Sequence, residues 1–135
     1  MAFIYADSCI FIYLLEGSRQ RKALIADILA PKNCTSDRIA YSDLTKLECL
    51  VHPMRNKNHD LCSKYKVLFK RNELYYIPVT PKIFEQATIL RSKFTIRTPD
   101  ALHLSAAIIE KCDVFLTNDK RLQNINVDVS IEVLE

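Results

Sequence analysis

Short apolar runs alternate along the chain with longer segments in which apolar residues recur at helical spacing. Phe3–Ala6 and Val114–Thr117 are runs of the length expected for buried strands. Further short strands are expected at Cys34–Ser36, Leu74–Val79 and Ile131–Leu134. Continuous apolar strands of this kind are typical of a parallel sheet that is covered on both faces.

Helical segments separate these strands, and polar residues mark where several of them begin. Asp7-Ser8 ends the first strand, and helical spacing follows from Ile10 to Leu15, up to Gly17. Ser42 caps a helix that runs to about His52, before Pro53, and Thr98-Pro99 begins another that runs to about residue 111. Other helices are expected over residues 20–30, 59–71 and 82–94. The alternation of strands and helices predicts an α/β fold with a mostly parallel sheet between two layers of helices.

Length and composition indicate one soluble domain over residues 1–135. Hydrophobic residues make up 49% of the chain and charged residues 26%, and no Gly- or Pro-rich linker divides it. A single glycine excludes phosphate-binding and dinucleotide-binding loops, which need several. The net charge, 19 − 16 = +3, permits a nucleic-acid partner without requiring one.

The cysteines and the N-terminus bear on the cellular compartment. Five cysteines cannot all pair within the chain, and no basic leader precedes the first apolar run. We therefore expect a reducing, cytoplasmic environment. No apolar run is long enough to span a membrane, so no membrane association is expected.

Two of the predicted strands run directly into acidic residues. Asp7 follows the first strand, and Asp119 follows Thr117 and Asn118 at the end of the fourth. In open parallel sheets, sites form at the carboxyl ends of strands. The two carboxylates can therefore meet if the first and fourth strands are neighbours.

Two more acids lie on predicted helices. Glu48 shares the i, i+3, i+4, i+7 spacing of Leu44, Leu47 and Val51, which predicts that it lies on the apolar face of its helix. Alternatively, it extends to solvent from the edge of that stripe, or it pairs with a lysine. Asp100 lies in the first turn of a helix that is apolar nearly all round. An acid there also interacts favourably with the helix dipole, which is the simpler explanation.

Four carboxylates at one edge of a sheet would repel one another unless a cation relieved them. Oxygen ligands in this number suit Mg²⁺ or Mn²⁺. Such an ion polarises phosphoryl oxygens and lowers the pKa of a bound water, and two ions ~4 Å apart can hold both the attacking and the leaving oxygen. The chemistry indicated is hydrolysis of a phosphodiester.

At these positions the sequence resembles the PIN-domain family and, within it, the VapC-type toxins of bacterial and archaeal toxin–antitoxin pairs. The resemblance covers nearly the whole chain, and its most specific parts are the segment around Asp100 and the ending Thr117-x-Asp119. The motifs that carry it are Asp7-Ser8, Ser42-x5-Glu48, Thr98-Pro99-Asp100-Ala101-Leu102-His103-Leu104-Ser105-Ala106-Ala107 and Leu116-Thr117-Asn118-Asp119.

The resemblance implies a PIN-like three-layer α/β/α sandwich around a sheet of four or five strands. It also implies an endoribonuclease that depends on Mg²⁺ or Mn²⁺ and cleaves RNA, with four acids as metal ligands and catalytic residues: Asp7, Glu48, Asp100 and Asp119. Ser8 and Thr117 would support these acids or bind water, while the role of Asn118 stays open. Toxins of this type are usually homodimers, neutralised by a small antitoxin protein that inserts a segment near the acids.

Three other functions compete with a toxin ribonuclease. A PIN nuclease that matures cellular RNA would have the same site, and the compact chain favours the toxin. An aspartate-based phosphatase usually needs a second acid two residues after the first, where this chain has Cys9. A non-catalytic PIN-fold binding module is disfavoured because all four acids are present.

Several basic residues suggest contacts with RNA. Arg97 lies shortly before Asp100 and could either offset the acids or hold a scissile phosphate. One predicted helix also has a basic face, which is either simply solvated or contacts the RNA backbone. Its residues are Lys64, Lys66, Lys70 and Arg71.

The histidines and cysteines allow two further interpretations. Cys49 with His52, and His59 with Cys62, form two i, i+3 pairs of the kind that bind zinc. Buried free cysteine is the simpler explanation, and we prefer it. His103 lies one turn after Asp100, and we interpret it as a packed helix residue rather than a general base.

Overall fold

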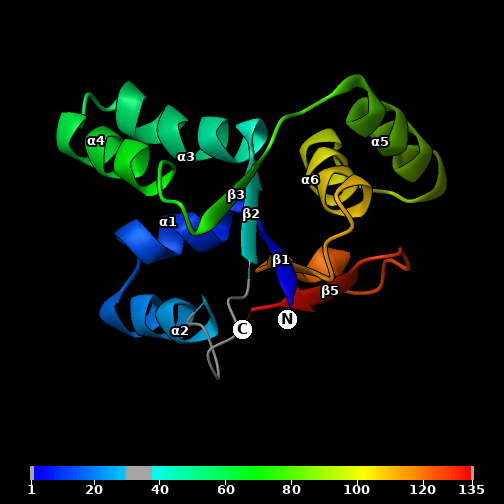
Figure 1. The fold of residues 1–135 in the computed structure, drawn as a ribbon, viewed down its shortest axis with the longest axis horizontal. Helices are drawn as coiled ribbons and strands as arrows, with labels where there is room; N and C mark the ends of the chain where they lie inside the picture. Colours follow the sequence, from blue (N-terminus) through cyan, green and yellow to red (C-terminus); the bar gives the residue numbers. More distant parts are fainter. Residues whose placement is uncertain (1, 30–37, 135) are drawn as a thin grey trace.

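The computed structural model describes residues 2–29 and 38–134. These residues form five strands in one entirely parallel sheet, in the order β3-β2-β1-β4-β5 (Figure 1). The strands are β1 (Phe3–Ala6), β2 (Arg38–Ser42), β3 (Leu74–Ile77), β4 (Val114–Thr117) and β5 (Ser130–Val133). The first strand lies at the centre, between β2 and β4, so the predicted first and fourth strands are neighbours.

Helices cover both faces of this sheet, which confirms the predicted three-layer α/β/α sandwich. Four of them pack on one face and two on the other, and Figure 1 shows the two groups on opposite sides of the strands. The first group is α1 (Ser8–Glu16), α2 (Arg19–Leu29), α3 (Asp43–Arg55) and α4 (His59–Leu68). The second group is α5 (Pro81–Lys93) and α6 (Thr98–Ile109), and a short 3₁₀ turn follows at Lys120–Leu122.

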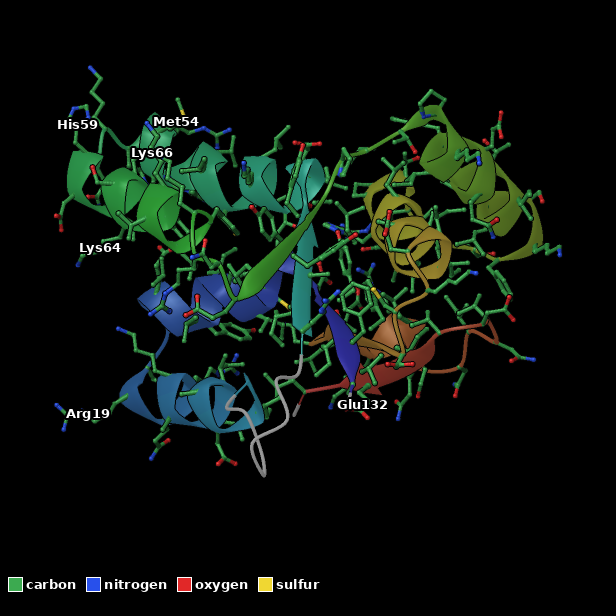
Figure 2. The ribbon with its side chains drawn as sticks, in the orientation of Figure 1. Arg19, Met54, His59, Lys64, Lys66 and Glu132 are labelled. Atoms are coloured by element: carbon green, nitrogen blue, oxygen red, sulfur yellow. The ribbon has the colours of Figure 1, made fainter. Side chains whose placement is uncertain are left out.

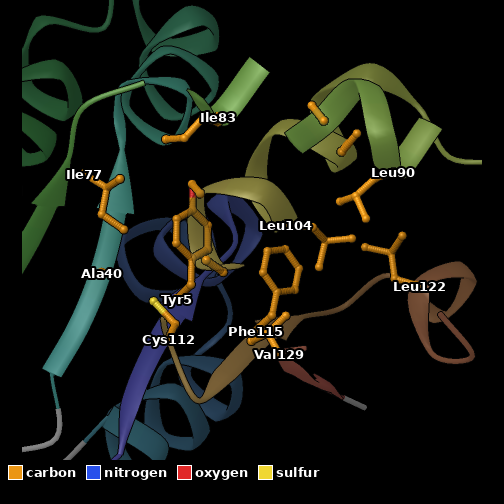
Figure 3. Packing of buried hydrophobic residues seen from close by; sticks show 14 residues of the cluster. Tyr5, Ala40, Ile77, Ile83, Leu90, Leu104, Cys112, Phe115, Leu122 and Val129 are labelled. Atoms are coloured by element: carbon orange, nitrogen blue, oxygen red, sulfur yellow. The ribbon is translucent and has the colours of Figure 1, made fainter. Parts of the chain in front are cut away.

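The central strand serves both layers because its side chains alternate between the two faces. Ile4 and Ala6 pack toward α1–α4, whereas Tyr5 packs toward α5 and α6. The Tyr5 ring is completely buried and stacks on Phe115 of β4, with ring centroids 5.5 Å apart (Figure 3). Leu104 of α6 belongs to the same cluster.

Most element boundaries differ from those expected by one to three residues, and two elements call for comment. The second strand that the structure describes is Arg38–Ser42, and the predicted strand Cys34–Ser36 lies outside the described residues. The position of this strand depends on its pairing with both β1 and β3. That pairing leaves no pattern in the neighbouring sequence. The third helix continues through Pro53 to Arg55, and Pro53 lies buried in its last turn, where its missing N–H removes one hydrogen bond of the helix.

The described helices do not include one that is long and apolar enough to cross a membrane.

Candidate active site

Asp7 and Thr117 meet where the two central strands end. The Asp7 amide donates to the carbonyl oxygen of Leu116, at 2.9 Å. The Thr117 hydroxyl donates to Oδ2 of Asp7 at 2.7 Å, and the same hydroxyl oxygen accepts from the Asp119 amide at 3.1 Å. Thr117 therefore links the carboxylate of Asp7 to the backbone of Asp119.

Ser8 links Asp7 to Glu48. Asp7 caps the first helix, α1, by accepting the Ser8 amide at 2.8 Å. The Ser8 hydroxyl lies 3.0 Å from Oε1 of Glu48, to which it donates, and 3.4 Å from Oδ1 of Asp7. The start of α1 thus brings together two acids that are 41 positions apart in the sequence.

The sequence argument that placed Glu48 on an apolar helix face was wrong. Leu47 and Val51 are exposed, at 61% and 44%, and the buried face of α3 includes Thr45, Cys49 and Pro53. Glu48 flanks that buried face, with its side chain 31% exposed. Of the two predicted alternatives for Glu48, its partly exposed position agrees with an edge residue, whereas no lysine pairs with it among the described residues.

His103 is the partner of Glu48. Its side chain is 1% exposed, and its Nε2 atom lies 2.5 Å from Oε1 of Glu48 and 3.7 Å from Oδ1 of Asp7. The prediction of a packed helix residue was right about burial but missed these polar contacts. The spacing of three residues from Asp100 was the available signal, because it places both side chains on the same side of α6.

These three side chains form a group that could hold a metal ion. The ligand atoms of Asp7, Glu48 and His103 all lie within 4.8 Å of one another, and no other such group exists among residues 2–29 and 38–134. Burial opposes the ionised form of Glu48, but the hydrogen bond and charge of His103, with smaller contributions from Ser8 and Arg97, outweigh it and lower the pKa of Glu48.

Asp100 lies apart from that group and pairs with Arg97. The Arg97 Nε atom lies 3.1 Å from Oδ2 of Asp100, which is almost buried, whereas the arginine side chain is 63% exposed. Arg97 also contributes to lowering the pKa values of Glu48 and Asp119. One exposed cation therefore acts electrostatically on three of the predicted site acids.

Asp119 has an arginine partner of its own, which the sequence analysis missed. Nε of Arg121 lies 2.9 and 3.2 Å from its two carboxylate oxygens, and Nη2 lies 2.6 Å from Oδ2. The hydrogen bond from Arg121 is the largest cause of the lowered pKa of Asp119. An arginine two residues after an acid at a strand end was the signal in the sequence.

Asn118 contacts the first helix rather than the acids. Its Nδ2 atom lies 2.5 Å from the hydroxyl oxygen of Tyr13, to which it donates. This contact ties the end of β4 to α1. Of the eight residues predicted for the site, Asp7, Glu48, Ser8 and Thr117 are joined by direct contacts or hydrogen bonds, and Arg97 with Asp100 forms a neighbouring pair.

The two cysteine–histidine pairs do not form a zinc site in the described part of the chain. Cys49 is buried and donates to the Ser8 carbonyl at 3.7 Å, and its burial raises the pKa of the thiol. His52 and His59 are exposed, and no three of these side chains form a group of candidate ligands. Cys9, Cys49, Cys62 and Cys112 are free thiols.

Of the four residues of the predicted basic face, Lys64 and Lys66 lie on α4, whereas Lys70 and Arg71 follow its end at Leu68. Lys64 and Lys66 extend from this helix into solvent (Figure 2), and Lys64 pairs with Asp60 at 3.5 Å. The surface pair contributes little to stability because both side chains are solvated. The exposure of Lys64 and Lys66 agrees with the simpler interpretation, in which these side chains are only solvated.

The fold and the site define a parallel α/β protein with carboxylates gathered at the carboxyl edge of its sheet. The chain belongs to the PIN domain family, whose model matches residues 4–128. No curated protein sequence matches it.

Several solved structures share this fold at low sequence identity. VapBC2 from Rickettsia felis, bound to a promoter DNA fragment, is 20% identical with a TM-score of 0.75, over 97% of this chain and 98% of that one. A toxin–antitoxin complex from Klebsiella pneumoniae is 21% identical with a TM-score of 0.69, over 95% and 99%. The sarcin-ricin loop cleaving toxin VapC20 from Mycobacterium tuberculosis is 14% identical with a TM-score of 0.66, over 83% and 86%.

Proposed function

We propose that this protein is a metal-dependent endoribonuclease and the toxin of a type II toxin–antitoxin pair. The observation that carries the proposal is the convergence of Asp7, Glu48 and His103 at the carboxyl edge of the sheet. Membership of the PIN domain family supports a nuclease, and the similarity to toxin–antitoxin structures supports the toxin. VapC20, one of the similar proteins, is described as a sarcin-ricin loop cleaving toxin.

The donor set fits a hard divalent cation. Carboxylate oxygens of Asp7 and Glu48 lie within 4.8 Å of each other, and Asp100 and Asp119 would supply further oxygens from neighbouring elements. Oxygen donors of this kind suit Mg²⁺ or Mn²⁺. When bound, the ion would polarise a phosphoryl oxygen and make a water more acidic.

The residues around these acids have separate roles in the proposal. Ser8 and Thr117 hold the Glu48 and Asp7 carboxylates through their hydroxyl groups. Arg97 is exposed beside the acids, so it can meet a phosphate of the RNA once a metal ion relieves its pairing with Asp100. Asn118 holds the end of β4 against α1.

Exposed apolar side chains on α3 supply a surface for the expected protein partners. Leu47, Val51 and Met54 are 61%, 44% and 65% exposed on the helix that carries Glu48 (Figure 2 labels Met54). Exposed apolar residues close together are typical of interaction sites. We propose that a second copy of this chain and the antitoxin use such surfaces, and light scattering with and without the antitoxin measures both assemblies.

The central experiment is RNA cleavage by the purified protein. Wild type with Mn²⁺ or Mg²⁺ should cleave RNA internally, EDTA should stop the reaction, and added metal should restore it. Asp7→Asn should be inactive, whereas Asp60→Asn, which alters a solvated surface acid, should retain activity. Cleavage that persists in EDTA, or in Asp7→Asn, would contradict the proposal.

Growth and RNA mapping separate the toxin from the alternatives. Brief expression of the wild type should arrest growth and create new RNA 5′ ends that are absent with Asp7→Asn, and co-expressed antitoxin should prevent both effects. Ordered processing of precursor RNA without growth arrest would favour the maturation nuclease. Binding of RNA without any new ends would favour the non-catalytic module.

A further inference from the structure

We propose that His103 is a positioning residue that holds the Glu48 carboxylate for metal binding, with its own ring fixed by the Tyr5 hydroxyl. This inference rests on the proposed function, because it assigns a task to a side chain within that site. His103 contacts Glu48 from α6, and Tyr5 contacts His103 from β1.

Both nitrogens of the His103 ring have partners. Nδ1 lies 2.7 Å from the Tyr5 hydroxyl, and Nε2 lies 2.5 Å from Oε1 of Glu48. The side chain is 1% exposed, so water cannot replace either partner without a rearrangement. The ring also packs edge-on against Tyr5, with centroids 5.6 Å apart. Its orientation is therefore determined at both ends.

The ionised state of Glu48 determines which atom donates in its hydrogen bond with His103. Glu48 is an acceptor when ionised, so the proton between it and His103 belongs to Nε2. The Tyr5 hydroxyl is the partner of Nδ1 whether or not that nitrogen carries a proton, because a hydroxyl group can either donate or accept. The Tyr5 oxygen in turn lies 2.8 Å from the Ser42 hydroxyl and 3.3 Å from that of Thr45.

These hydrogen bonds begin and end on the same helix. Ser42 caps α3, and its amide donates to Thr45 Oγ1 at 3.1 Å. From there the contacts pass through Tyr5 and His103 and return to Glu48, three residues after Thr45 on α3. The start of the helix thus helps to fix the carboxylate that the same helix presents to the site. Partners of this kind orient metal ligands, and their loss typically weakens metal binding by roughly 10-fold to 100-fold.

The same arrangement assigns His103 a supporting task rather than direct ligation. A ring nitrogen that carries a proton toward Glu48 offers no lone pair to a metal ion. Mn²⁺ bound to wild type should therefore show no coupling to a directly bonded nitrogen in pulsed electron paramagnetic resonance. A clear ¹⁴N coupling that disappears in His103→Gln would overturn the positioning role in favour of direct ligation.

The first test needs no metal. In ¹⁵N-labelled, metal-free protein, long-range ¹H–¹⁵N correlation spectra report which ring nitrogens carry protons. We expect His103 Nε2 to be protonated at neutral pH and to remain in one environment, and Tyr5→Phe to shift its Nδ1 signal. His52 and His59 are exposed and serve as internal controls. An unprotonated Nε2 in His103 would overturn the inference.

The second test compares Mn²⁺ affinities by calorimetry. His103→Leu should bind Mn²⁺ roughly 10-fold or more weakly, and His103→Gln, whose amide can still donate to Glu48, should recover most of the affinity. His52→Leu is the control for a lost histidine, and Tyr65→Phe, which removes a buried hydroxyl bonded to Glu16 away from this contact series, is the control for Tyr5→Phe.

The outcomes separate the inference from the proposed function. Equal Mn²⁺ affinity in wild type and folded His103→Leu would overturn the positioning role while leaving a metal nuclease intact. A wild type that binds no Mn²⁺ or Mg²⁺ would overturn the metal-dependent function and the metal-binding role of His103 together. If His103→Leu fails to fold, Tyr5→Phe decides: it should bind Mn²⁺ more weakly than Tyr65→Phe, and an affinity equal to that of the wild type would overturn the inference.

Discussion

Arg97 and Asp100 form an ion pair across the start of α6, with the arginine Nε atom 3.1 Å from the carboxylate oxygen. The acid is almost buried and the arginine is mostly exposed. Arg121 holds Asp119 in a similar way. The outer two acids of the proposed site therefore each have a cation within the chain, while the inner two, Asp7 and Glu48, lie against hydroxyl groups and His103.

Removing the charge of Arg97 tests whether this side chain binds RNA. Arg97→Gln should raise the KM for RNA by roughly 10-fold with little change in kcat, because a phosphate contact that is equal in the ground and transition states affects only binding. The variant should also bind Mn²⁺ more tightly, since Asp100 loses a competing cation. Arg55→Gln, an exposed arginine at the end of α3, is the control. Unchanged KM would indicate that Arg97 only offsets the acids.

Neutralising Asp7 or Asp100 should abolish cleavage without unfolding the chain. Asp7→Asn and Asp100→Asn keep the size and hydrogen-bonding ability of the side chains but remove a metal-binding charge. Loss of several kcal/mol of transition-state stabilisation corresponds to a rate lower by roughly 1000-fold or more. Single-turnover cleavage measures the rate, and circular dichroism checks the fold. Activity near the wild-type level in a folded variant would remove that acid from the site.

Metal binding should appear as added thermal stability. An ion that binds only the folded state at 100 times its Kd contributes ~2.7 kcal/mol, which raises the melting temperature of a domain of this size by roughly 10 °C. Scanning calorimetry of wild type in EDTA and in Mn²⁺ measures this shift. Asp7→Asn should show a much smaller shift, while Asp60→Asn should match the wild type. Equal shifts in all three proteins would place the ion elsewhere.

The pair of Asp119 and Arg121 predicts a specific pH dependence of stability. The hydrogen bond from Arg121 lowers the folded pKa of Asp119 below its ordinary value of 3.8. The pair therefore stabilises the native state above that value, and this contribution is lost as the pH falls through the lower, folded pKa. Wild type should melt at a slightly higher temperature than Arg121→Gln at pH 7, and the difference should vanish in acid. A difference that grows on acidification would contradict the sign of the shift.

The sequence located the acids better than it explained them. Asp7 and Asp119 were predicted from strand ends, and the pairing of β1 with β4 places those ends side by side. Glu48 was predicted from an apolar stripe that is in fact exposed at Leu47 and Val51. The family motif identified Glu48 as a site residue, whereas the helical periodicity predicted the wrong face of α3 as the buried one. Burial of a short helix face depends on which neighbours cover it, and periodicity cannot identify them.

The sequence by itself determined the alternation of strands and helices, because apolar spacing and caps act within a few residues. It also determined that acids follow two of the strands. Only the tertiary structure decided which polar groups meet: His103 contacts Glu48 across 55 positions and Tyr5 across 98. Contacts at such separations follow from the order of strands and from the packing of α3 and α6 against them. Neither the strand order nor the helix packing can be predicted from patterns of a few neighbouring residues.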